Sequence, residues 1–189
     1  MAYILNKPYH SLRYRGWHMD SQKTARFIFY SILLLLLIQT VYYYPKLPEQ
    51  VASHFNAAGE PDDWTGKQAF FLIMWGTYIL ITIIFAAMGP LLSRIPESLI
   101  NLPNRGYWFA PERKAETVRV LSEYMLWMGS ATLVLFLAIM HITVEANIGV
   151  DPGIGPPWLI LGPYLGFTVL WCIAFFLRFA RKPKRNDEC

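Results

Sequence analysis

Charged residues are scarce in this chain and make up only 16% of its 189 residues. Hydrophobic residues account for 54%, and the mean hydropathy is +0.29. A soluble domain normally carries about 25% charged residues, so the composition excludes an ordinary soluble globular protein. The formal net charge of +4 is modest, and the basic residues fall in separate clusters. A nucleic-acid-binding surface, which needs a broad basic face, is therefore not expected either.

Cysteine is also scarce, and the signatures of common enzymes are missing. Cys172 lies within an apolar run and Cys189 is the last residue, so neither a disulfide framework nor a paired-cysteine metal site is indicated. The sequence has no G-x-S-x-G motif, no P-loop and no Rossmann glycine pattern. No feature of the sequence favours catalysis, and we expect a protein that is not an enzyme.

What the sequence does contain is four long apolar stretches, at about 27–44, 69–92, 120–144 and 158–179. A bilayer core about 30 Å thick needs about 20 mostly apolar residues in a helix. A backbone in lipid must satisfy its hydrogen bonds within the segment, so each stretch is predicted to be a helix. The predicted fold is an all-α integral membrane protein, a four-transmembrane-helix bundle over residues 27–179. An N-terminal segment, 1–26, and a basic tail, 180–189, flank it.

The distribution of lysine and arginine predicts the orientation of these helices. Along the chain, the five segments that flank the spans hold five, two, five, none and five Lys or Arg residues. Because positive charge is retained on the cytoplasmic side, both termini and the second loop are predicted to be cytoplasmic. The first loop then forms a compact exterior cap between helices 1 and 2. The second loop forms a cytoplasmic elbow between helices 2 and 3.

The first exterior loop places several distinctive residues at fixed spacing between two spans. They are Leu47, Pro48, Val51, His54, Phe55, Gly59, Asp62 and Lys67. With the flanking spans, over residues 28–92, this pattern resembles the uncharacterised N-terminal domain of SdpI-type toxin-immunity proteins. The stretch Ile100–Arg113 also resembles a motif in small bacterial members that carry this domain. The resemblance implies a bacterial inner-membrane protein, here a short form without the separate SdpI module, and it implies no activity.

Three functions remain open for such a protein. In the first, it is a non-catalytic envelope protein that binds a toxin, a lipid or another ligand through its exterior cap. In the second, it is an accessory subunit of a membrane complex, surrounded by membrane lipids and other membrane-protein subunits. In the third, it is a metal-dependent membrane enzyme or a small transporter with an exterior histidine–carboxylate site.

Contact with a ligand or partner is expected from polar and aromatic residues in the cap and in the elbow. The candidates are His54, Asn56, Gly59, Asp62 and Trp64 in the cap, and Asn101, Asn104, Trp108 and Arg113 in the elbow. In the alternative interpretation, these side chains hold their own loops together through local hydrogen bonds, as Asn and Asp commonly do.

Two histidines and a carboxylate are the candidate metal ligands. His141 and Glu145 are four residues apart near the exterior end of the third span, so they share one face of the helix. His54 lies on the same side of the membrane in the predicted topology. Two imidazoles and a carboxylate suit Zn²⁺ if they converge. No compact motif such as H-E-x-x-H accompanies them, and a structural role is the alternative.

Overall fold

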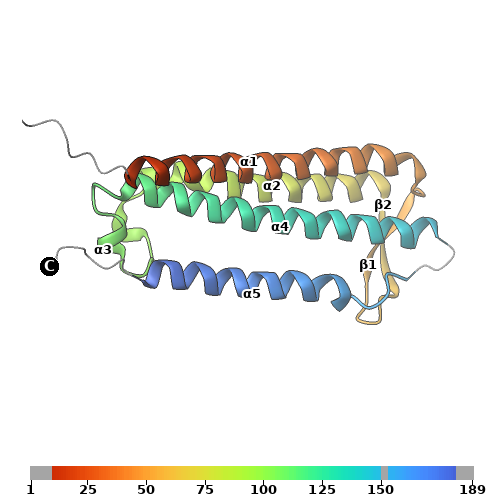
Figure 1. Cartoon of the computed structure of the whole chain (residues 1–189). Helices are drawn as coiled ribbons and strands as arrows, with labels where there is room; N and C mark the ends of the chain where they lie inside the picture. Colours follow the sequence, from red (N-terminus) through yellow and green to blue (C-terminus); the bar gives the residue numbers. More distant parts are fainter. Residues whose placement is uncertain (1–9, 150–152, 182–189) are drawn as a thin grey trace, which may run out of the picture.

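The computed structural model describes residues 10–149 and 153–181 (Figure 1). Its elements, in chain order, are α1 (His10–Tyr43), the 3-10 turn η1 (Tyr44–Lys46), β1 (Gln50–Phe55), β2 (Pro61–Gly66), α2 (Lys67–Arg94), the 3-10 turn η2 (Glu97–Leu99), α3 (Arg105–Trp108), α4 (Lys114–Ile148) and α5 (Trp158–Ala180). The prediction of an all-α chain needs one correction, because the loop between α1 and α2 forms a β-hairpin.

Four helices in the described part of the chain are long and apolar enough to cross a membrane, as the sequence predicted. The candidate spans are Ser21–Lys46, Lys67–Arg94, Lys114–Ile148 and Trp158–Ala180. Each of them contains or closely overlaps one of the four apolar stretches. Large apolar side chains point outward along these helices as well as inward, which is typical of helices that face both neighbours and lipid.

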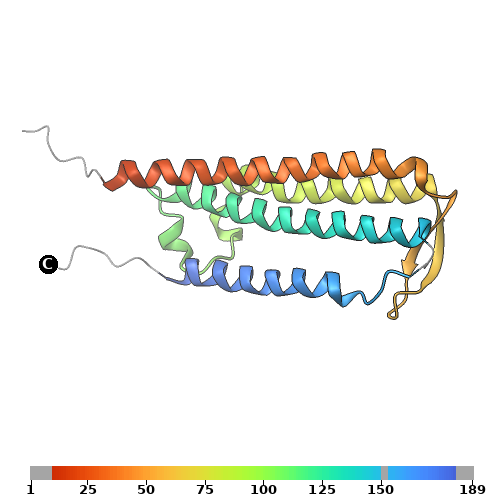
Figure 2. The same cartoon turned by 45° about the vertical axis from the view of Figure 1, so that its right-hand side comes forward.

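Three of these helices form a bundle, and the fourth lies at its side. α4 packs against both α1 and α2, while α5 packs against α4 on the side away from α1 and α2 (Figures 1 and 2). The β-hairpin lies across one end of the bundle, which we call the hairpin end. The segment containing η2 and α3 lies at the other, which we call the elbow end.

The main core runs between α1, α2 and α4 and continues into the hairpin. In α1, the buried residues Ala25, Phe29, Ile32 and Leu36 recur every three or four positions and form one stripe. The other buried members of this core are Leu47, Val51, Phe70, Phe71, Tyr78, Ile81, Leu126, Leu133, Met140 and Val144. The hairpin is therefore packed as part of the bundle.

Close helix contact in the bundle depends on one glycine of α4. A Cβ atom added at Gly129 would lie 2.7 Å from Phe29 Cε2 and 2.7 Å from Phe85 Cβ. Small residues let helices approach closely where lipid supplies no hydrophobic driving force. Gly162 and Gly166 of α5 have the G-x-x-x-G spacing typical of such contacts, but a Cβ at either would meet no described atom within 4 Å.

Candidate functional site

The loop between α1 and α2 forms a two-stranded antiparallel sheet, which we call the cap. Gln50 of β1 pairs with Gly66 of β2, and Phe55 pairs with Pro61 near the turn. The register shifts on either side of His54, with one extra residue in β1 before it and one extra residue in β2 after it, so the sheet bulges there. A bulge redirects the side chains around it, and here it lies at one of the predicted contact residues.

The turn of the cap is closed by Asn56 and Gly59. The Oδ1 atom of Asn56 accepts hydrogen bonds from the backbone N–H groups of Ala58, at 2.9 Å, and Glu60, at 3.1 Å. Gly59 has a φ of +85°, in the left-handed region that glycine adopts without a steric penalty. Both residues thus shape the turn, which is the structural alternative that the sequence left open for them.

The same turn is docked onto the segment that leads into α5. The N–H of Ile154 donates a hydrogen bond of 2.9 Å to the carbonyl oxygen of Gly59. A Cβ at position 59 would collide with the carbonyl oxygen of Gly155. Glycine is therefore required here for close approach as well as for its backbone conformation.

A second anchor joins the cap to α4 through Asn147. The side-chain Oδ1 of Asn147 accepts a 2.8 Å hydrogen bond from the N–H of Ala52, and its Nδ2 donates to the carbonyl oxygen of Ala52 at 3.0 Å. Nδ2 also donates to the carbonyl oxygen of Thr143 at 2.7 Å. The amide of Asn147 therefore pairs with the free edge of β1 as a neighbouring strand would.

A third anchor is Lys67, the first residue of α2. Its Nζ lies 2.7 Å from Oε1 of Glu49 and 3.3 Å from the carbonyl oxygen of Leu47. The side chain of Lys67 is only 13% exposed, whereas that of Glu49 is 84% exposed. Because one partner is open to solvent, we regard this ion pair mainly as a positional tie between the two ends of the cap.

The outer surface of the cap carries His54, Asp62 and Trp64. His54 Nδ1 lies 2.5 Å from Asp62 Oδ1, with the imidazole 69% exposed. Trp64 is 53% exposed. These residues lie on a scaffold that is tied to α2, α4 and the segment before α5. Of the five contact residues predicted in the cap, these three are therefore presented at its surface.

The ion pair between His54 and Asp62 makes the cap sensitive to pH. The hydrogen bond that the His54 imidazole donates to Asp62, followed by the negative charge of Asp62, raises the pKa of His54 above its ordinary value of 6.5. The interaction is fully present below pH 6.5 and is lost as the pH rises through the raised pKa. We expect Asp62→Asn to lower the pKa of His54 in an NMR titration of labelled imidazole. Asp63→Asn, which removes a smaller contribution, is the control, and an unchanged pKa in Asp62→Asn would contradict the pairing.

Two of the three candidate metal ligands, His54 and His141, have different partners in the structure. His141 Nδ1 lies 2.8 Å from the hydroxyl of Tyr43, across the interface between α4 and α1, whereas His54 pairs with Asp62. Residues 10–149 and 153–181 contain no group of three or more His, Cys, Asp or Glu side chains placed to hold a metal ion. The structure therefore does not gather His54, His141 and Glu145 into such a group.

In the elbow, Asn104 and Trp108 bind the end of α5. Asn104 Nδ2 donates to the carbonyl oxygens of Phe179, at 3.2 Å, and Ala180, at 2.8 Å. Trp108 Nε1 donates to the carbonyl oxygen of Phe179 at 2.8 Å. The last carbonyls of a helix have no partner within it, so these two side chains complete the end of α5.

Arg113 makes contacts within the elbow, whereas the side chain of Asn101 is exposed. Arg113 Nε donates to the carbonyl oxygen of Tyr107 at 2.8 Å, and the guanidinium of Arg113 lies 4.1 Å from the centroid of the Tyr107 ring. Arg113 is also 3.0 Å from Glu112. Asn101 is exposed. Three of the four contact residues predicted in the elbow are thus used to hold it together.

Comparison with known proteins identifies relatives of this chain. Residues 31–76 match the family model described as a domain of unknown function, DUF1648. This range runs from α1 through the whole cap into α2. The chain is also similar to an uncharacterised protein of Archaeoglobus fulgidus, with 31% identity over 132 residues, which is 61% of this chain and 68% of the relative. No solved structure matches the chain significantly.

Proposed function

Because the chain belongs to the same family as the Archaeoglobus fulgidus protein and carries a DUF1648 domain, we propose a function that centres on that domain. We propose that the protein is a non-catalytic, multi-pass membrane protein that binds a partner protein through its cap. The proposed binding surface consists of His54, Asp62 and Trp64. We place it on the exterior of the cytoplasmic membrane, with both termini and the elbow in the cytoplasm. The alternation of Lys and Arg along the chain supports this orientation.

The observation that carries this proposal is that the cap is fixed on one side and open on the other. Asn147, Lys67 and Ile154 tie it to the rest of the molecule, while His54 and Trp64 remain exposed. A surface that is already rigid loses little conformational entropy when it binds, so more of the contact energy is realised as affinity. Exposed tryptophan is also enriched at the centres of protein interfaces.

The strand β2 offers a backbone surface as well. In the described part of the chain the sheet has two strands, and β2 has a strand neighbour, β1, along one edge. An open edge of this kind accepts an extended segment of a partner through main-chain hydrogen bonds. Main-chain hydrogen bonds do not distinguish one partner sequence from another, so side chains such as Trp64 would then provide the specificity.

The family assignment supports the cap as the functional part, because the DUF1648 match spans it completely. The resemblance to SdpI-type proteins suggests a toxin as one kind of partner. The four apolar helices suit a second kind, a membrane-protein subunit with which this chain assembles as an accessory component. Both kinds use the same exterior surface in this proposal, and the identity of the partner distinguishes them.

Site-specific photo-crosslinking in intact cells of the native host tests the proposal. A photoreactive amino acid at position 64 is expected to give one discrete protein adduct, which mass spectrometry identifies. The matched control is position 170 of α5, where Leu170 is 69% exposed on an apolar face. A small secreted protein in the adduct would indicate immunity, and an integral membrane protein would indicate a subunit.

The adduct must also depend on the surface around Trp64. His54→Ala combined with Asp62→Ala is expected to reduce its yield severalfold without lowering the amount of protein in the membrane. If position 64 gives no protein adduct, or the same products as position 170, the cap is not a protein-binding surface and the proposal is wrong.

A further inference from the structure

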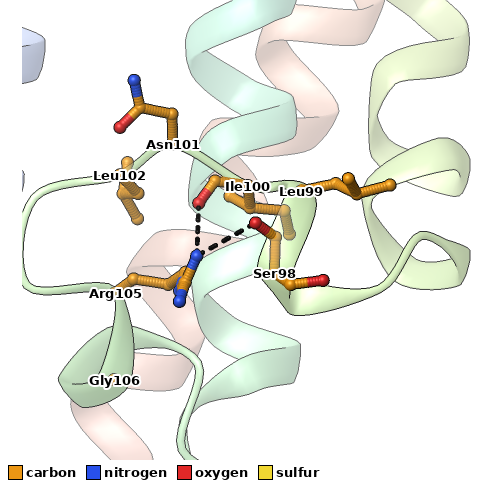
Figure 3. A pocket seen from close by; sticks show the side chains of 7 residues that line it. All are labelled: Ser98, Leu99, Ile100, Asn101, Leu102, Arg105 and Gly106. Atoms are coloured by element: carbon orange, nitrogen blue, oxygen red, sulfur yellow. Dashed lines mark hydrogen bonds between the residues drawn. The ribbon is translucent and has the colours of Figure 1, made fainter.

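The elbow end holds a cavity that the proposed function does not use. It has a volume of about 380 Å³ and lies between residues 98–102 on one side and Arg105 and Gly106 on the other (Figure 3). We propose that this cavity binds a phosphate group, and that Arg105 is the residue that recognises it. This inference is independent of the cap and of any partner that binds there.

Arg105 is held in place by the backbone of the opposite wall. Its Nη1 donates to the carbonyl oxygens of Ser98, at 3.1 Å, and Ile100, at 3.5 Å (Figure 3). Among contacts with described residues, these hydrogen bonds use one nitrogen of the guanidinium and leave Nε and Nη2 for a ligand. A planar guanidinium with two such nitrogens matches two oxygens of a phosphate group. Its orientation by the backbone means that little ordering is needed on binding.

Among the described residues, the charge of Arg105 has no carboxylate partner, in contrast to three basic residues that follow it in the elbow and at the start of α4. Arg113 pairs with Glu112, Lys114 with Glu97, and Arg119 with Glu116. Within residues 10–149 and 153–181, Arg105 has no carboxylate within 4.0 Å. A cation without a counter-charge at the wall of a cavity attracts an anion, and phosphate, like carboxylate, has a geometry that suits the guanidinium.

The position of the cavity makes a lipid headgroup one source of this phosphate. The cavity begins four residues after Arg94, where the candidate span Lys67–Arg94 ends. The ends of spans lie at the depth of the lipid headgroups. Leu99, at the same wall of the cavity, is 73% exposed. This exposure suits contact with the acyl chains that lie below the lipid headgroups. A small phosphorylated molecule from the aqueous phase is the other source with the same chemistry.

Two other residues of the cavity provide matched variants. Gly106 lines the cavity, and outside its chain neighbours and its own helix backbone no described atom lies within 4 Å of an added Cβ, so Gly106→Leu adds bulk at the cavity wall while retaining the Arg105 guanidinium. Asn101 lines the cavity, but its side chain points away from Arg105 (Figure 3). Asn101→Ala therefore changes the wall without changing the proposed phosphate contact, and it serves as the control.

The experiment uses the full chain in nanodiscs and has two arms. In one, native mass spectrometry counts phosphatidylglycerol retained by protein taken from discs of mixed phosphatidylglycerol and phosphatidylcholine. In the other, inorganic phosphate is titrated calorimetrically into protein in pure phosphatidylcholine discs. Retention of phosphatidylglycerol without binding of inorganic phosphate identifies the lipid source. Binding of inorganic phosphate identifies the soluble source.

In whichever arm the wild-type protein binds, Arg105→Gln and Gly106→Leu are each expected to weaken binding about tenfold. Arg105→Lys should recover only part of it, since an ammonium lacks the two-point geometry, and Asn101→Ala should bind as the wild type does. The inference is overturned if the wild type binds neither probe. It is also overturned if Gly106→Leu, which keeps Arg105, and Arg105→Gln both bind as tightly as Asn101→Ala.

Discussion

Replacing Gly129 with leucine is expected to lower the thermal unfolding midpoint of the detergent-solubilised protein by about 4–8 °C. The physical reason is the contact of α4 with α1 and α2, because a Cβ at this position lies 2.7 Å from Phe29 Cε2 and 2.7 Å from Phe85 Cβ. The Cβ of Phe85 is attached directly to the backbone of α2. It cannot rotate away, so α2 and α4 must move apart.

Two opposing effects set the size of this change. Overpacking a well-packed interior costs about 1–3 kcal/mol, and the fixed position of the Phe85 Cβ favours the upper end of that range. Replacing glycine within a helix returns about 0.8 kcal/mol because leucine has the higher helix propensity. The net loss is about 2 kcal/mol, and for a chain of this size each kcal/mol corresponds to about 2–4 °C.

Gly76→Leu is the matched control for this prediction. Gly76 lies in the middle of α2, and a Cβ there would meet no described atom within 4 Å. Only the gain in helix propensity applies, so its unfolding midpoint should equal or slightly exceed that of the wild type. Equal midpoints for the two variants, measured by circular dichroism in the same detergent, would contradict the close packing at Gly129.

The four helices could be predicted from the sequence because the signal for them is local. A run of about 20 apolar residues has few alternatives in a membrane, whatever the rest of the chain does. The elbow was predictable in outline for a related reason, since Pro96 and Pro103 interrupt any helix that would continue from α2. The structure accordingly has short turns there, between Arg94 and Lys114.

The long-range partners of several polar residues could not be predicted, because those partners are far away in the sequence. Asn104 and Trp108 had the residue types of a partner-binding site, but they bind the end of α5 more than 70 residues later, at Phe179. Asn147 was not identified at all, although a polar side chain near the end of an apolar helix was the available signal. Its partner, Ala52, is 95 residues away.

The placement of small residues and histidines shows the same limit. Gly129 and Gly166 are both glycines in long apolar helices, but only Gly129 faces a neighbouring helix in the described chain. His54 and His141 were grouped because the predicted topology puts them on one side of the membrane. Sharing a side does not fix a distance: His141 meets Tyr43, and His54 meets Asp62.

The second large effect is expected at Asn147, whose replacement by leucine should release the cap from α4 while leaving the helices packed. Ala52 is buried, and without the amide of Asn147 its N–H and C=O groups lose their partners. A buried polar group left unpaired costs about 1–3 kcal/mol. Two such groups, with partial access of water after the cap loosens, give an expected cost of about 2 kcal/mol. This loss is local to the hairpin end.

Hydrogen exchange monitored by mass spectrometry on peptides covering residues 50–66 measures this release. We expect Asn147→Leu to increase exchange at Ala52 and its strand neighbours roughly 30-fold, the factor that corresponds to about 2 kcal/mol, with no change in peptides from α2. Asn147→Asp keeps the oxygen that accepts from Ala52 and should give a smaller increase. Asn101→Leu, at an exposed asparagine of the elbow, should give none. If exchange in residues 50–66 is unchanged in Asn147→Leu, the cap is held by its buried apolar residues Leu47 and Val51. The hydrogen bonds of the Asn147 amide then contribute nothing measurable.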